Sequence, residues 1–108
     1  IRNWLHAEDT ANAAITIVDS GVKNEIYNAA GGFEQSNLET VSKLISVLTQ
    51  GEHYDINDYV DTSFSRAGQD LRYALDDTKL RSLGWEPKKI FDEEIINIVN
   101  YYKDKFIW

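Results

Sequence analysis

The stretch RAGQDLRYALDDTKLRSLGW (residues 66–85) sets arginines, acids and two glycines among apolar residues. Its middle part, LRYAL, favours a brief extended segment. Asp76 or Asp77 then provides an N-cap for a short helix, and Gly84 is a typical residue to end one. The stretch therefore predicts a turn, a short strand and a capped helix in succession.

Apolar residues inside and just after this short helix are expected in the core. Leu80 and Leu83 share one face of the helix, and Trp85 follows the glycine that ends it. We expect the indole of Trp85 to fill the gap between this helix and the last helix of the chain.

Three longer helices are predicted from apolar residues that recur at helical spacing. The first has Asp9 or Thr10 as N-cap and Gly21 as its end. The second opens at Ser36 in a capping box with Glu39 and ends at Gly51, and the last starts near Asp92. The apolar residues that define these helices are, in order, Ala11, Ala14, Ile15 and Val18; Leu38, Val41, Leu44, Ile45 and Leu48; and Ile95, Val99, Tyr102 and Phe106.

Strand signals are few and short. Glu25 to Asn28 reads as a strand before the glycine pair Gly31–Gly32, LRYAL as a second one, and an alternating patch covers Tyr59 to Asp61. Four helices with two or three short strands are too few for a complete doubly wound sheet. The fold class is therefore α/β, close to α+β: a mostly helical small domain that spans residues 1–108.

Composition limits the functional classes. The net charge of −7 argues against general binding to nucleic acid, which needs a basic surface, and no apolar run is long enough to span a membrane. Absence of cysteine excludes disulfides and fits a cytoplasmic location. Because the chain starts at Ile1 and has no methionine, we expect it to be a piece of a longer polypeptide.

Motifs for nucleotide binding or catalysis are missing from the sequence. It contains no glycine fingerprint after a strand, no P-loop and no nucleophile elbow. His6 and His53 do not have metal-ligand spacing and are expected to be structural or surface residues. No general acid–base pair is evident, so we expect no catalytic residue and no metal site in this chain.

The arginines are the candidates for a ligand. Arg66 lies in a turn where Gly68 allows a backbone to come close to a ligand, and a guanidinium group can bind two phosphate oxygens at once. Arg72 and Arg2 are the other candidates for binding an anion. The alternative is that each arginine pairs with one of the 18 acids at the surface. Asn37 has an equally simple interpretation as a polar residue in the first turn of a helix.

Four stretches occur in the order and spacing of one family: IRNWLHAEDTANA, EIYNAAGGFEQSN, RAGQDLRYALDDTKLRSLGWEPK and FDEEIINIVNYYKDKF. They resemble the C-terminal portion of nucleotide-sugar 4,6-dehydratases, closest to the dTDP-glucose 4,6-dehydratases, which are extended short-chain dehydrogenase/reductase enzymes. The resemblance covers essentially the whole chain, and its most specific part is G-x-D-x-R-Y-x-L-D.

The resemblance implies a substrate-binding role. In such NAD-dependent lyases an N-terminal Rossmann domain, absent from this chain, carries NAD and the catalytic residues. The C-terminal part grips the nucleotide diphosphate of the sugar substrate, dTDP-glucose or a related sugar nucleotide. Carried over by motif, Arg2, Asn37 and Arg66 face the nucleotide and diphosphate, and Gln69 can donate a hydrogen bond there. No cofactor is expected to bind to this part alone.

The sequence departs from the family pattern in one turn, where Arg66-Ala67-Gly68-Gln69-Asp70 replaces Arg-Pro-Gly-His-Asp. A UDP-sugar epimerase or decarboxylase of the same superfamily therefore stays an alternative. Asp70 and Arg72 match the pattern and are expected to pair and hold the loop.

The other alternative is a stand-alone, non-catalytic module that associates with itself. Without the Rossmann domain, the first helix and the EIYNA segment are expected to expose apolar area, which favours association.

Overall fold

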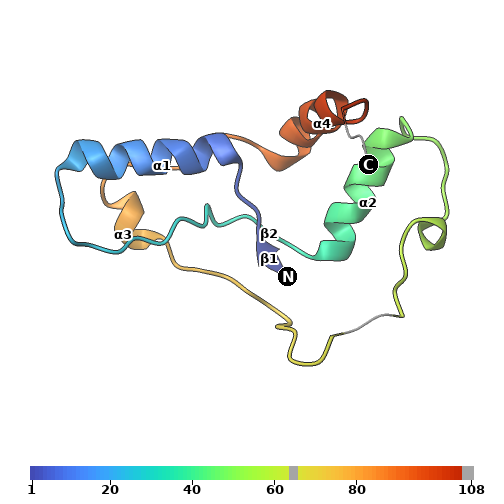
Figure 1. Cartoon of the computed structure of the whole chain (residues 1–108), viewed down its shortest axis with the longest axis horizontal. Coiled ribbons are helices and arrows are strands. Elements are labelled where there is room, and N and C mark those ends of the chain that lie inside the picture. Colours follow the sequence, from blue (N-terminus) through green and yellow to red (C-terminus); the bar gives the residue numbers. More distant parts are fainter. Residues whose placement is uncertain (64–65, 106–108) are drawn as a thin grey trace.

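The computed structural model describes residues 1–63 and 66–105 of the chain. Within these ranges a two-stranded sheet lies between two groups of helices, α1 with α3 and α2 with α4 (Figure 1). The elements are, in order, β1 (Arg2–Asn3), α1 (Ala7–Ser20), β2 (Glu34–Gln35), α2 (Asn37–Leu48), the 3-10 turn η1 (Ile56–Asp58), α3 (Thr78–Arg81) and α4 (Phe91–Tyr102). The prediction of a small, mostly helical domain is confirmed.

The sheet is formed by residues that are distant in sequence. β1 runs antiparallel to β2, with Arg2 opposite Gln35 and Asn3 opposite Glu34. Tyr73, in the LRYAL segment, forms an isolated parallel bridge with Arg2 on the other edge of β1. LRYAL therefore lies along the sheet as an extended segment, as predicted.

Residues 25–28 do not form the predicted strand, and neither does the patch at residues 59–61. A strand is defined by ladder hydrogen bonds to a neighbour, and no other described segment pairs with residues 25–28. The prediction of a strand at residues 25–28 is therefore wrong for the described part of the chain. Tyr59 instead belongs to an irregular loop, where its ring meets Tyr54 edge to face at 6.1 Å.

α1 begins three or four residues earlier than predicted. His6 is its N-cap, because its Nδ1 accepts a hydrogen bond of 3.0 Å from the backbone N–H of Glu8. Asp9 and Thr10, the predicted caps, lie inside the first turn. The predicted end is confirmed: Gly21 takes the left-handed conformation (φ 72°) that a glycine adopts without strain.

Only a narrow face of α1 is buried. Ala13 is buried and Ile17 is half-buried, whereas Ile15 and Val18 are 56% and 77% exposed. The expectation that this helix exposes apolar area is therefore confirmed.

Trp85 is in the core and packs against α3, as predicted, but the other helix that it contacts is α1 and not α4. Its ring belongs to a cluster with Ala13 of α1 and Leu80 of α3, and Leu83 is half-buried against that cluster. The indole N–H donates to the backbone carbonyl of Asp9 at 3.1 Å. A buried indole N–H needs an acceptor, and the backbone of α1, at Asp9, provides it. This hydrogen bond fixes the ring of Trp85 against α1 and not against α4.

α2 and α4 pack against each other to form the other half of the molecule. Ser36 caps α2 by accepting from the backbone N–H of Glu39 at 3.1 Å, so the predicted capping box is confirmed. Ile45 and Ile95 are buried in this half, as expected for the apolar faces of the two helices. α4 begins at Phe91, close to the predicted start, and Phe106 lies outside the described residues.

The described chain is elongated. Its radius of gyration is 17.0 Å, whereas a compact domain of this length has about 13 Å. The two groups of helices lie on either side of the sheet (Figure 1), and the buried cluster of Ala13, Leu80 and Trp85 includes no residue of α2 or α4.

The two halves are tied by a buried carboxylate. The side chain of Asp9, which is only 2% exposed, accepts hydrogen bonds of 3.0 Å each from the backbone N–H groups of Lys88 and Lys89. These residues connect Trp85 to the start of α4. Asp9 thus fixes the path of the chain from the first half to the second.

Replacing Asp9 with alanine is expected to lower the free energy of unfolding by about 2–4 kcal/mol, because two part-buried backbone N–H donors lose their acceptor. Urea denaturation of the chain measures this loss. Asp19→Ala, an exposed acid on the same helix, is the matched control and is expected to change stability by less than about 0.5 kcal/mol. Equal stabilities of the two variants would contradict this role of Asp9.

Asp77 is a second buried carboxylate; it stands at the N-cap position of α3, but its side chain makes no capping hydrogen bond. Asp76 bonds the N–H of Thr78 at 2.8 Å, whereas Asp77 accepts from the backbone N–H of Gly31 at 2.7 Å and from Arg81 at 2.8 Å. Burial raises the pKa of the Asp77 carboxyl, but the hydrogen bonds from Arg81 and Gly31 outweigh burial, and the net pKa lies below the ordinary value.

Because its folded-state pKa is lowered, Asp77 stabilises the fold above its unfolded pKa of about 3.9, and this contribution is lost as the pH falls through the folded value. Asp77→Asn is expected to cost about 1 kcal/mol near pH 7 and progressively less below about pH 4. Urea unfolding of both proteins across this range tests the prediction. A cost that stays constant down to about pH 2 would refute it.

Candidate functional site

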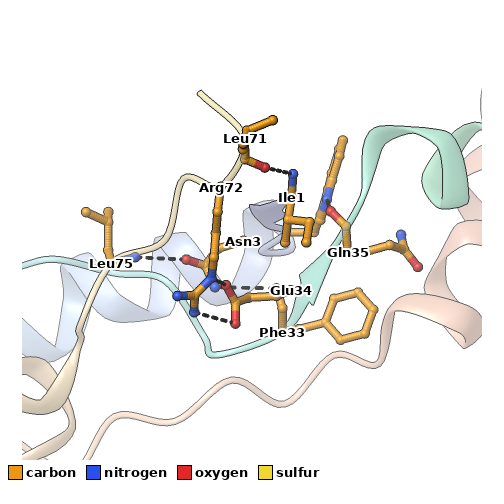
Figure 2. A network of polar contacts seen from close by, with 9 residues as sticks. Ile1, Asn3, Phe33, Glu34, Gln35, Leu71, Arg72 and Leu75 are labelled. Carbon is orange, nitrogen blue, oxygen red and sulfur yellow. Dashed lines mark hydrogen bonds and ion pairs between the residues drawn. The ribbon is translucent and has the colours of Figure 1, made fainter. Parts of the chain in front are cut away.

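The segment that follows the Arg66 turn is fixed to the beginning of the chain. The amine of Ile1 donates to the carbonyl of Leu71 at 2.8 Å, and the N–H of Tyr73 donates to the carbonyl of Ile1 at 2.7 Å. Farther along, the N–H of Leu75 donates to the side-chain oxygen of Asn3 at 3.0 Å (Figure 2). Three distant segments of the chain, residues 1–3, 34–35 and 71–75, therefore meet at one small sheet.

An ion pair strengthens this junction. The guanidinium of Arg72 binds the carboxylate of Glu34 with two hydrogen bonds of 2.6 and 2.9 Å, as Figure 2 shows. Hydrogen bonding to Arg72 lowers the pKa of Glu34, and the same contact raises the pKa of Arg72. The prediction that Arg72 pairs with Asp70 is wrong, because β2 brings Glu34 beside the 71–75 segment.

Arg2 and Asn37 lie on elements that are connected through the sheet. Arg2 is on β1 opposite Gln35, and Asn37 is the first residue of α2, two residues after Gln35. Both residues are exposed. Because Gln35 pairs with Arg2 and is followed two residues later by the first residue of α2, the sheet places Arg2 close to the N-terminal end of α2.

Arg66 and Gln69 occupy a turn that leads into the 71–75 segment. The N–H of Gln69 donates to the carbonyl of Arg66 at 3.3 Å, and Gly68 has a φ of +77° with open space around its α-carbon. The positive φ explains the glycine, since other residues adopt it only with strain. The turn is exposed and opens to solvent, which leaves room for a ligand.

The four arginines divide into two kinds. Arg72 is paired with Glu34, and Arg81 is paired with Asp77. Within the described residues, the side chains of Arg2 and Arg66 make no ion pair or hydrogen bond. In a chain of net charge −7, two guanidinium groups without an acidic partner among the described residues are unexpected.

Histidines and acids do not form a second site. His6 caps α1, and its Nε2 lies 3.7 Å from Glu94, so it has the structural role that was expected. His53 is exposed. Across residues 1–63 and 66–105 no group of three or more histidines and acids is arranged to hold a metal ion.

An apolar cavity of about 650 Å³, which sequence reasoning missed, lies between the start of α1, the helices α2 and α4, and the segment that leads into α4. Phe33 stacks on Phe91 at 5.5 Å on its wall, and Trp4 meets Phe91 edge to face at 6.3 Å. These aromatic residues are 29 or more positions apart, so no local motif reveals the cavity. Among the described residues that line it, none is a predicted site residue.

Comparison with known proteins gives relatives that are about three times as long as this chain. The low-salt glycan biosynthesis protein Agl12 of Haloferax volcanii is 37% identical over 102 residues, which cover 94% of this chain and 31% of that protein. The dTDP-glucose 4,6-dehydratase of Neisseria meningitidis is 34% identical over 118 residues, covering 100% of this chain and 32% of the relative. dTDP-glucose 4,6-dehydratase 1 of Escherichia coli is 33% identical over 111 residues, which cover 100% of this chain and 31% of that protein.

The chain is therefore homologous to part of the dTDP-glucose 4,6-dehydratases, and the resemblance seen in its motifs is confirmed. It spans about a third of the length of these relatives, which is consistent with a C-terminal portion. A scan against models of known families gives no match. None of the helices in the described ranges is long and apolar enough to cross a membrane.

Replacing Arg72 with methionine is expected to loosen the 71–75 segment. Amide hydrogen exchange at Tyr73 and Leu75 should accelerate about two- to fivefold, the range that loss of an exposed ion pair supports. Arg66→Met removes the same charge from the same part of the chain without breaking an ion pair. If both variants exchange alike at Tyr73, the Arg72–Glu34 contact does not hold this segment.

Proposed function

We propose that this chain is the substrate-binding part of an NAD-dependent dTDP-glucose 4,6-dehydratase and holds the nucleotide diphosphate of the sugar nucleotide. One observation carries the proposal: Arg2 and Arg66, which have no acidic partner within residues 1–63 and 66–105, are the two arginines that the family resemblance assigns to the nucleotide and diphosphate. Relatives named as dTDP-glucose 4,6-dehydratases support the choice of substrate.

The chemistry of the four residues suits a diphosphate. Two guanidinium forks can each bind two phosphate oxygens. Asn37 stands in the first turn of α2, where backbone N–H groups and the helix dipole favour an anion. Gln69 adds a neutral donor in the Arg66 turn.

Binding by this part alone should be weak. Association entropy opposes the gain from two exposed arginines, and the net charge of −7 repels an anion until it comes within the Debye length of about 8–10 Å. A dissociation constant of about 1 mM is expected. In the complete enzyme this binding would orient the hexose for oxidation and dehydration by NAD and catalytic residues of an N-terminal Rossmann domain. We assign no catalytic residue and no NAD contact to this chain.

The decisive experiment is calorimetric or NMR titration of dTDP into the chain and its variants. Arg2→Met and Arg66→Met should each raise the dissociation constant about tenfold, because a charge-assisted hydrogen bond contributes about 1.5 kcal/mol at the low end. Lys23→Met removes an exposed positive charge elsewhere and should change the constant less than about twofold. Equal effects of all three substitutions would contradict the proposed site.

The same titration separates the alternatives of substrate. Tighter binding of UDP than of dTDP would favour a UDP-sugar epimerase or decarboxylase over a dTDP-glucose dehydratase. Turnover of dTDP-glucose by these 108 residues alone would contradict a purely substrate-binding role.

A further inference from the structure

The side chain of His6 lies between the start of α1 and the start of α4. Its Nδ1 accepts the hydrogen bond of 3.0 Å from the backbone N–H of Glu8, and its Nε2 faces the carboxylate of Glu94 on α4 at 3.7 Å. Only 22% of the His6 side chain is exposed. Both ring nitrogens are therefore directed at groups of the protein, one in each of the two groups of helices.

The capping hydrogen bond fixes which nitrogen of the His6 ring carries the proton. A ring nitrogen that accepts a hydrogen bond must be unprotonated, so the proton of the neutral ring is on Nε2. This Nε2–H group faces Glu94 at a distance that is longer than a hydrogen bond. The cap of α1 thus requires the neutral form of His6.

A second proton on the ring is incompatible with this cap. It binds to Nδ1, which then becomes a donor and faces the N–H donor of Glu8 at 3.0 Å. Because two donors repel each other, the ring must turn away from the backbone of α1. Histidine changes its charge between about pH 5 and pH 8 in proteins, so mild acidification acts on this contact.

Four acids of α1 and α4 lie near the ring, and three of them are already bound at short distance. These are Asp9, bound by the N–H groups of Lys88 and Lys89 at 3.0 Å each; Glu8, bound by the Nζ of Lys89 at 3.0 Å; and Asp92, bound by the Nζ of Lys43 on α2 at 2.7 Å. Tyr102 is a further titratable residue that lines the cavity beside His6. The fourth acid is Glu94.

Glu94 is the acid that can bind the protonated ring. Among the described residues its carboxylate has two ion-pair partners, His6 at 3.7 Å and Lys89 at 3.8 Å, and both distances exceed that of a hydrogen bond. A positive charge on the ring attracts this carboxylate and allows the contact to shorten to a charge-assisted hydrogen bond of about 2.8 Å. The hydrogen bond from Lys89 to Glu8 raises the pKa of Lys89, so Lys89 keeps its charge and its contact with Glu8.

We infer that His6 is a pH-sensitive contact between α1 and α4: the neutral ring caps α1, and the protonated ring releases the cap and binds Glu94. The change is local, because the carbonyl of His6 accepts the N–H of Thr10 at 3.0 Å and this hydrogen bond does not involve the ring. The new contact with Glu94 offsets the lost cap, so the stability of the whole chain changes less than the protection of the first turn. The inference goes beyond the proposed nucleotide site and does not depend on it.

The place of this contact in the fold gives it a consequence for the rest of the chain. The first turn of α1 also contains Asp9, which binds the N–H groups of Lys88 and Lys89 just before α4. A first turn without a side-chain cap has an additional unsatisfied N–H group and opens more readily. Acidification is therefore expected to loosen the connection between the two groups of helices at the start of α1, while the interior of each helix stays intact.

NMR of the 108-residue chain between about pH 8 and pH 5 tests the inference. At the higher pH the nitrogen resonances of the His6 ring should show the proton on Nε2. The protection factor of the Glu8 amide, which is the exchange rate of a free amide divided by the measured rate at the same pH, should fall about fivefold as the ring becomes protonated. Loss of an N-cap has an effect of about this size. The amide of Thr16, in the middle of α1, should keep its protection factor.

Variants separate the cap from the titration. In His6→Asn the amide oxygen can cap α1 but does not titrate, so the protection factor of Glu8 should be the same at both ends of the pH range. Glu94→Gln removes the partner of the protonated ring and should move the midpoint of the His6 titration to lower pH. Asp19→Asn removes the same charge at the other end of α1, about 20 Å away, and should leave the midpoint unchanged.

Three results would overturn the inference. These are a neutral ring with its proton on Nδ1, a Glu8 protection factor in the original chain that does not change with pH, and an equal fall of this factor in the original chain and in His6→Asn. A simultaneous loss of protection at Thr16 would show that the whole of α1 unfolds and would contradict a local exchange of contacts. Because none of these measurements involves a nucleotide, the inference and the proposed function are tested separately.

Discussion

The buried carboxylate of Asp9 is the contact on which the arrangement of the chain depends. Asp9 lies in the first turn of α1, and its carboxylate accepts hydrogen bonds from the backbone N–H groups of Lys88 and Lys89. The backbone carbonyl of Asp9 accepts a hydrogen bond from the indole N–H of Trp85. A buried charge is costly unless its lone pairs are satisfied, and here backbone donors from a segment almost 80 residues away satisfy them. Because residues 85–89 lead from α3 to α4, this single side chain sets how the α2–α4 half stands relative to α1.

Around that contact the molecule is only partly packed. One core lies between α1 and α3, another set of contacts lies between α2 and α4, and the small sheet with its Arg72–Glu34 ion pair joins them. The arginines also divide into two pairs with different surroundings. Those needed to hold the chain together are matched with acids, and Arg2 and Arg66 are left without an acidic partner among the described residues. An acidic protein that binds an anion needs such a division, because a paired guanidinium would have to give up its carboxylate first.

Local signals allowed much of the fold to be predicted. The cap at Ser36 and the glycines Gly21 and Gly84 act within a few residues of where they stand, so helix positions follow from the sequence. The partner of Arg72 and the packing of Trp85 depend on segments 38 and 76 residues away, which no local pattern encodes. The prediction of a strand at residues 25–28 was wrong for the same reason, because a strand requires a neighbouring strand and a local pattern does not show whether one is present. The candidate site was assigned by resemblance, and the structure adds which of its arginines have no acidic partner.

The central claim is that Arg2 and Arg66 bind one and the same anion. The most direct test is to follow the Nε–H resonances of the four arginines by NMR while inorganic pyrophosphate is added to the chain. The account predicts that the resonances of Arg2 and Arg66 shift together with one common dissociation constant. The resonances of Arg72 and Arg81 are expected not to shift, because these side chains remain bound to their carboxylates. Shifts of only one of the two, or two clearly different dissociation constants, would show separate sites and contradict the account.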